Sequence, residues 1–215
     1  MKKLGFRWLA LVLSLILVAG FGVWAAKSSA AGSSRLTLPS TVGEIVDCEA
    51  DRASEKEVFF PDLGSFSMTS LGDAPRIVAR VGRAFVSSAG LKTVPLQIIS
   101  NGGHSFAEGL GETRFWLDAS RPVQSAIWEK SPGTEFPAIQ EMRFHFLYTA
   151  EAFPGRVFRS MNPSIMRSEN VLAFPPPPGT VYTLVKPIDL EDIAHPGVVV
   201  GRVLKNRVVI PQAEK

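Results

Sequence analysis

The chain has 215 residues, of which 46% are hydrophobic and 20% are charged, and its formal net charge is +3. The excess of basic residues comes from the N-terminal segment, because from Arg35 onward acidic residues outnumber basic ones by one. A nucleic-acid-binding domain needs a basic face, so this balance excludes nucleic acid as an expected partner. The only cysteine, Cys48, excludes an internal disulfide, so the fold must be held by its core.

Residues 1–26 have the layout of an export leader that is typical of bacteria. A basic start precedes an uncharged apolar stretch over residues 8–26, and small residues follow it. We expect the basic end to stay in the cytoplasm while the apolar stretch enters the bilayer. Cleavage before Ala26 or before Gly32 satisfies the small-residue rule and predicts an exported domain, periplasmic or secreted.

The alternative is that the leader is retained as a membrane anchor. A spanning helix needs about 20 apolar residues, and the stretch over residues 8–26 approaches that length. The domain would then be anchored in the inner membrane and lie outside the cytoplasm, with the uncleaved leader as its only membrane contact. Residues 27–34 are small residues with one lysine and predict a flexible tether, and residues 35–215 predict a single, mainly β domain.

Alternating apolar and polar residues predict strands in three segments. Residues 142–148 place one methionine and three aromatic side chains on one face. Residues 77–85 place apolar side chains, Phe85 among them, on one face, and Arg83 breaks the pattern at a predicted strand end or bulge. Residues 113–117 alternate in the same way.

Turn-forming residues set the predicted boundaries. Asn101-Gly102-Gly103 follows an apolar run and predicts a tight turn. Lys205-Asn206 lies between two valine-rich runs and predicts a hairpin, because asparagine tolerates positive φ. Pro175–Pro178 lack backbone donors, which predicts an extended connection before a strand over Val181–Val185.

Two short segments carry helical signals. Cys48–Glu57 is polar and charged, and Ile188–Ala194 follows one proline and stops before another. Neither is long enough to define a fold class. The many short strands, separated by turns rich in glycine and proline, predict an all-β fold: an antiparallel β-sandwich of immunoglobulin-like or jelly-roll-like type behind the apolar leader.

No catalytic, cofactor-binding or metal-binding motif stands out in the sequence. The three histidines, His104, His145 and His195, lack the spacing of a zinc site. His104, Ser105 and Glu108 follow two glycines and are the first residues to consider for a small site, although a tight turn by itself explains the glycines. We therefore predict no catalytic residue, no cofactor residue and no metal ligand.

Two groups of side chains have both a functional and a structural interpretation. Asp189, Glu191 and Asp192 are the densest acidic group, and they predict either a calcium site or, more simply, a solvated turn. Trp116 and Trp128 are either platforms for stacking sugar rings or, more commonly, core residues.

Cys48 is surrounded by acidic residues, which disfavour the thiolate and argue against a nucleophile. We expect it to be buried and inert, with an intermolecular disulfide as the alternative.

These observations favour an exported, non-catalytic module with a binding or structural role in the bacterial envelope or outside the cell. Its expected partner is a protein or a carbohydrate. An exported hydrolase that uses paired carboxylates on a β scaffold is the alternative. A further alternative is an envelope assembly subunit that offers an exposed strand edge to its partners.

Overall fold

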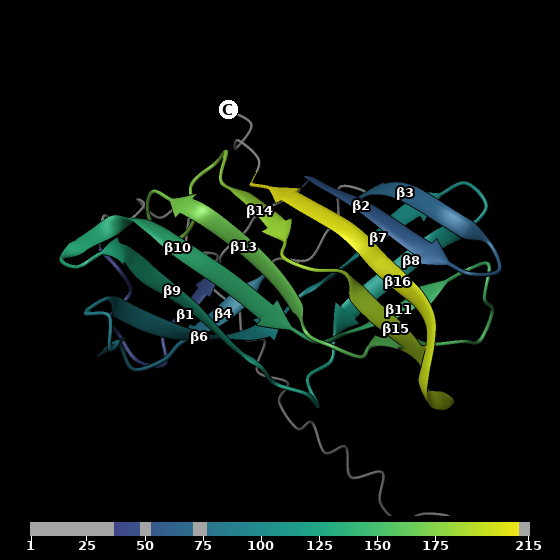
Figure 1. Cartoon of the computed structure of the whole chain (residues 1–215), viewed down its shortest axis with the longest axis horizontal. Helices are drawn as coiled ribbons and strands as arrows, with labels where there is room; N and C mark the ends of the chain where they lie inside the picture. Colours follow the sequence, from purple (N-terminus) through teal and green to yellow (C-terminus); the bar gives the residue numbers. More distant parts are fainter. Residues whose placement is uncertain (1–36, 48–52, 71–76, 211–215) are drawn as a thin grey trace, which may run out of the picture. The chain divides into compact units, whose positions relative to one another are not determined.

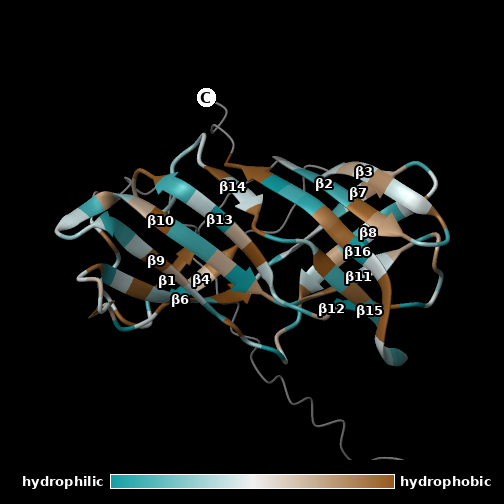
Figure 2. Cartoon of the chain, in the orientation of Figure 1, coloured by the Kyte–Doolittle hydropathy of each residue, from teal (hydrophilic) through white to brown (hydrophobic). Residues whose placement is uncertain are grey.

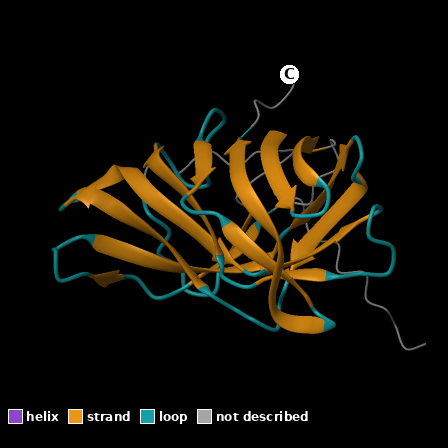
Figure 3. Cartoon of the chain, turned by 45° about the vertical axis from the view of Figure 1, so that its right-hand side comes forward, coloured by secondary structure: helices purple, strands orange, loops and turns teal. Residues whose placement is uncertain are grey.

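The computed structural model describes residues 37–47, 53–70 and 77–210, and every regular element among them is a β-strand (Figure 3). The chain divides into two compact units, residues 1–32 and 33–215, and all of the described residues belong to the second. The predicted leader, the predicted tether and Cys48 therefore lie outside the described residues.

Within the described ranges, a 16-stranded antiparallel sheet contains a closed barrel of eight strands and an extension of eight further strands (Figure 1). The barrel strands are β2 (Ala53–Phe60), β3 (Gly64–Ser70), β7 (Gly102–Ala107), β8 (Gly111–Leu117), β11 (Phe146–Ala150), β12 (Phe158–Ser160), β15 (Ile188–Asp192) and β16 (His195–Val209). The extension strands are β1 (Ile45–Asp47), β4 (Val78–Val81), β5 (Phe85–Val86), β6 (Lys92–Ser100), β9 (Gln124–Ser131), β10 (Thr134–Phe144), β13 (Ser164–Val171) and β14 (Val181–Leu184).

The pairing of β2 with β16 closes the barrel. Val58 lies opposite Val203, and Ser54 lies opposite Val208. From β16 the sheet runs through β15, β12, β11, β8, β7 and β3 back to β2. The predicted sandwich is therefore wrong. A sandwich keeps two separate sheets, whereas these eight strands form one sheet whose first and last strands pair with each other. The alternation in the sequence is the same in both architectures, since it reports only that one face of each strand is buried.

The extension and the barrel share continuous strands. β6 passes into β7 with Asn101 between them, and β10 passes into β11 with His145 between them. β16 pairs along one edge with β2, and along the other edge first with β15 and then with β14. The two parts therefore form one sheet in which some strands leave the barrel and continue into the extension.

The three predicted strand segments are present in the structure. Residues 142–148 lie in β10 and β11, residues 113–117 lie in β8, and residues 77–85 contain β4 and β5. The four inward side chains of 142–148 are all buried, as predicted. Arg83 lies beyond the end of β4, as predicted, whereas Phe85 is 49% exposed on the short strand β5. Figure 2 shows hydrophobic and hydrophilic residues alternating along β9, β10 and β13.

Two predicted turns are extended chain instead. Lys205 and Asn206 lie inside β16, where they pair with Glu57 and Lys56 of β2. The backbone stays extended there because Lys205 and Asn206 pair with β2 on one edge of the strand, and residues 207–209, which follow them, pair with both β2 and β14. Asn101 separates β6 from β7 without starting a hairpin, so the two glycines that follow it belong to a strand.

The two predicted helical segments are strands as well. The described part of Cys48–Glu57 belongs to β2, and Ile188–Ala194 contains β15. Each of these strands has a neighbour on both edges, and this pairing outweighs a weak local preference for helix. The predicted non-strand connection at Pro175–Pro178 is confirmed, and so is the strand after it, which is β14.

Candidate functional site in the barrel

A narrow cavity lies inside the barrel, and the paired strands β10 and β13 of the extension also contribute to its wall. It offers about 40 Å³ to water-sized molecules. Its wall is mostly apolar and consists of Ser54, Lys56, Val58, Met68, Ile77, Thr113, Phe115, Met142, Phe144, Phe146, Tyr148, Ser164, Met166, Ile188, Val203, Asn206 and Val208. Among these described lining residues there is no aspartate, glutamate, histidine or cysteine.

Two buried polar atoms in this wall have no hydrogen-bonding partner within the described part of the chain: the hydroxyl of Tyr148 and Oδ1 of Asn206. Tyr148 is 4% exposed, and burial raises the pKa of its hydroxyl, so that it remains protonated. The neighbouring Thr113 opposes this shift, but its hydroxyl donates to the carbonyl oxygen of Ser105 at 3.2 Å, and Tyr148 forms no hydrogen bond of regular geometry. Because buried polar atoms are nearly always paired, these two atoms make the cavity wall the candidate site.

Lys56 brings a positive charge to the cavity. Its Nζ lies 3.9 Å from the centre of the Phe115 ring, which projects from β8 on another side of the barrel. The register partners of Lys56 are Met68 on β3 and Asn206 on β16. An ammonium group, an amide and a thioether therefore occupy one level of the barrel wall.

The sequence gives only a weak signal for Lys56. Successive side chains of β2 point to opposite faces, so Ser54, Lys56 and Val58 share the face that lines the cavity. Lys56 is the charged side chain on that face, but the interpretation of Cys48–Glu57 as a helix conceals it. Asn206 is concealed in the same way by its interpretation as a turn residue.

Aromatic rings pack below Tyr148 and fill the barrel there. Phe60 lies 4.7 Å from Phe153 and 5.5 Å from Phe158, measured between ring centres. Tyr148 lies 6.4 Å from Phe158, so its ring joins the cluster. The guanidinium of Arg156 lies 5.0 Å from the centre of Phe158 and covers the cluster. Among these four rings, Tyr148 is the one that also lines the cavity.

The predicted acidic group forms ion pairs between strands. Each carboxylate is held by an arginine: Asp189 by Arg202, Glu191 by Arg159 and Asp192 by Arg156. The backbone N–H of Ala194, and after it the Arg156 guanidinium, lower the pKa of Asp192. These pairs engage the oxygens that a calcium ion would need, and no cluster of three metal-ligating side chains occurs among the residues described.

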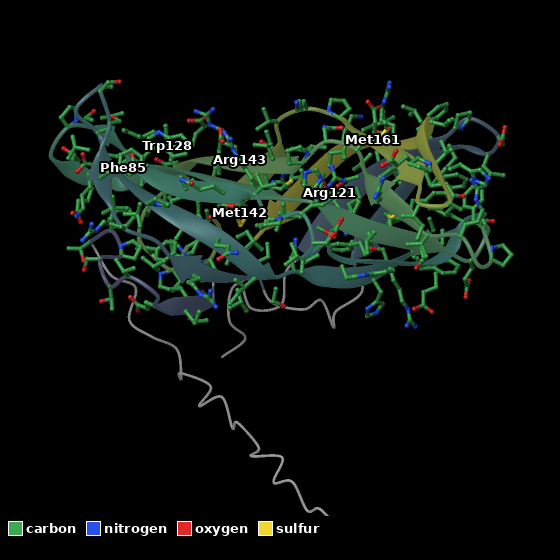
Figure 4. The ribbon with its side chains drawn as sticks, turned by 90° about the horizontal axis from the view of Figure 1, so that it is seen from below. Phe85, Arg121, Trp128, Met142, Arg143 and Met161 are labelled. Atoms are coloured by element: carbon green, nitrogen blue, oxygen red, sulfur yellow. The ribbon has the colours of Figure 1, made fainter. Side chains whose placement is uncertain are left out.

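A second polar group lies where the barrel and the extension meet. Nδ1 of His145 lies 3.2 Å from the carbonyl oxygen of Ser160 and 3.1 Å from its Oγ. Arg121 donates to the carbonyl oxygens of Ser160 and Met161 at 2.7 and 3.1 Å. Figure 4 labels Arg121 and Met161 among the side chains. Burial, and after it the charge of Arg121, lowers the pKa of His145. Because these side chains bond to the backbone, we assign them a structural role at the crossing.

The structure does not bring His104, Ser105 and Glu108 together. His104 and Ser105 are consecutive residues of β7, so their side chains point to opposite faces, and Glu108 is exposed in the turn before β8. His195 lies at the exposed start of β16. The three histidines therefore belong to separate parts of the fold.

The two tryptophans lie outside the cavity. Trp116 is 39% exposed on β8. Trp128 is partly buried on β9, and the guanidinium of Arg167 lies 5.6 Å from its ring centre.

Comparisons with known proteins add a likeness of fold. No family model matches the chain, and no curated protein sequence matches it. The structure is similar to that of DynF from the dynemicin biosynthesis pathway of Micromonospora chersina, with a TM-score of 0.62 and 16% sequence identity over 86% of this chain and 94% of DynF. This likeness supports the barrel over the predicted sandwich. It gives no support to the predicted envelope role.

The described residues contain no helix with the length and hydropathy needed to cross a membrane. The apolar stretch over residues 8–26 is outside them, so export and anchoring stay predictions.

Proposed function

We propose that this chain is a non-catalytic binding protein that encloses a small, mostly apolar molecule inside its barrel. The observation that carries the proposal is the cavity wall, in which apolar side chains surround two unpaired polar atoms, the Tyr148 hydroxyl and Asn206 Oδ1. In such a site the apolar wall supplies affinity and the few polar groups fix the orientation of the ligand.

The size of the cavity restricts the ligand to a short or narrow molecule. A water molecule needs about 10–15 Å³ of such space, so the space in the cavity corresponds to about three waters. Met68, Met142 and Met166 line it, and methionine side chains change rotamer easily to admit a larger guest. An eight-stranded barrel is wide enough for its side chains and one small ligand. A short alkyl chain fits these conditions.

The chemistry of the wall supports binding over hydrolysis. Hydrolysis by paired carboxylates needs two acidic groups in one cleft, and none of the described lining residues is acidic. The carboxylates of Asp189, Glu191 and Asp192 are held by arginines elsewhere in the barrel. The hydrolase, the assembly subunit and the protein or carbohydrate partner stay sequence-based predictions.

Filling the cavity should weaken binding. Val203→Phe adds a ring to the wall, and we expect it to weaken the binding of hexanol at least about tenfold, measured by NMR titration of amide resonances. Val198→Phe is the matched control, since Val198 is exposed on the same strand and outside the cavity. Overpacking costs about 1–3 kcal/mol, so circular dichroism must confirm folding, and Val208→Ile offers a milder filling variant. Wild-type protein that gives no saturable shifts with hexanol would contradict the proposal.

A further inference from the structure

We infer that the molecule held in the barrel carries a hydroxyl group that donates a hydrogen bond to Oδ1 of Asn206. This inference rests on the proposed binding function and names the polar group that the ligand carries. Oδ1 of Asn206 is a buried acceptor without a donor among the described residues. An amide oxygen can only accept hydrogen bonds, so only a group that carries a proton can satisfy it.

The register of β16 directs Asn206 into the barrel. Asn206 and Val208 are two residues apart on the strand and both line the cavity. Lys205 and Arg207 face outward, where they form ion pairs with Glu57 and Glu55 of β2. The unpaired oxygen therefore faces the cavity.

The surroundings of Asn206 select a neutral donor. Lys56 is its cross-strand neighbour, and a cationic ligand placed beside the Lys56 ammonium would be repelled. A carboxylate has no proton to give, and its oxygens would face Oδ1 of Asn206. A hydroxyl donates a hydrogen bond to Asn206 and can accept one from the Lys56 ammonium or from the Tyr148 hydroxyl. A primary amide also donates, but it brings further polar atoms that need partners in an apolar wall.

The test compares two isomers, hexanol and pentyl methyl ether, which have the same atoms but differ in their ability to donate. We expect wild-type protein to bind hexanol about five- to tenfold more tightly, which is the worth of one hydrogen bond. Asn206→Leu should remove that preference without weakening the binding of the ether. Gln124→Leu, at an exposed position outside the barrel cavity, is the control. Hexanoate and hexylammonium should bind wild-type protein less tightly than hexanol.

Each outcome either supports or contradicts the inference. Equal affinity for the two isomers, a preference for hexanol that persists in Asn206→Leu, or tighter binding of hexanoate would overturn it while the binding function stands. Binding of neither isomer would overturn the proposed function itself. If Asn206→Leu does not fold, Asn206→Val replaces it, because it also removes the acceptor and should likewise remove the preference for hexanol over the ether.

Discussion

Among the individual residues, His145 is a buried group whose protonation is coupled to the fold. It is 7% exposed at the point where β10 passes into β11. Its Nδ1 lies within hydrogen-bonding distance of both the carbonyl oxygen and Oγ of Ser160, so the neutral ring has a partner there in either tautomer. A second proton would be buried close to Arg121, and these two effects lower the pKa against the smaller opposing influences of Ser160 and Asp118.

We predict that the protein loses stability as the pH falls below about 6.5, the ordinary pKa of the imidazole. In that range the unfolded chain takes up a proton at His145 that the folded chain excludes, so protonation favours unfolding, by at most about 1.4 kcal/mol per pH unit. His145→Asn should keep a donor for Ser160 and flatten this dependence. Urea unfolding of wild type and variant at about pH 5 and pH 7 measures the change in the free energy of unfolding between the two pH values. The half-buried His104→Asn serves as control, and an unchanged slope in His145→Asn would contradict the prediction.

Among the elements, β16 decides the architecture. It is the only described strand of 15 residues, and it pairs with three others. Gly201 lets it pass close to the aromatic cluster, because a Cβ at this position would lie 2.7 Å from a ring carbon of Phe60. Toward its end β16 has β2 on one edge and β14 on the other, so its backbone groups are engaged on both sides. This double pairing closes the barrel and ties it to the extension.

A proline in the doubly paired part of β16 should weaken the closure. Arg207 lies opposite Glu55 of β2 and Thr183 of β14. Arg207→Pro removes a backbone donor and leaves an acceptor on a neighbouring strand without its partner, at a cost of about 1–3 kcal/mol. Arg207→Ala, which keeps the backbone N–H, should lie within about 0.5 kcal/mol of wild type. Thermal unfolding compares the stabilities of the two variants. Equal stabilities would show that this pairing does not hold the barrel closed.

For the whole molecule, the described fold is a barrel with an extension, and the predicted leader is the basis for its predicted location outside the cytoplasm. Fractionation of bacteria that express the full-length gene, followed by intact-mass measurement, tests that location. We expect a soluble periplasmic or secreted species that has lost residues up to Ala25 or up to Ala31. A full-length species in the membrane fraction would show that residues 8–26 are an anchor, and a full-length species in the cytoplasm would contradict export.

The all-β composition and several strands could be predicted because alternation reports burial on one face. Residues 142–148 show this, since their inward side chains are buried although the segment spans β10, His145 and β11. The closure could not be predicted, because it depends on β2 meeting β16 across a long stretch of sequence. The candidate site was missed for the same reason. Lys56, Tyr148 and Asn206 come from three strands, and no sequence spacing relates them.

The sequence by itself determined the near-neutral charge after the leader, the reliance on a core without an internal disulfide, and the positions of the strands that alternate regularly. Each of these depends on residue type or on neighbours a few positions apart. Only the tertiary structure decided between sandwich and barrel. Only the tertiary structure showed that Lys205 and Asn206 lie within β16 and not in a hairpin turn. Strand pairing supplies hydrogen bonds to both edges of a segment, and that energy exceeds the local preferences that the sequence displays.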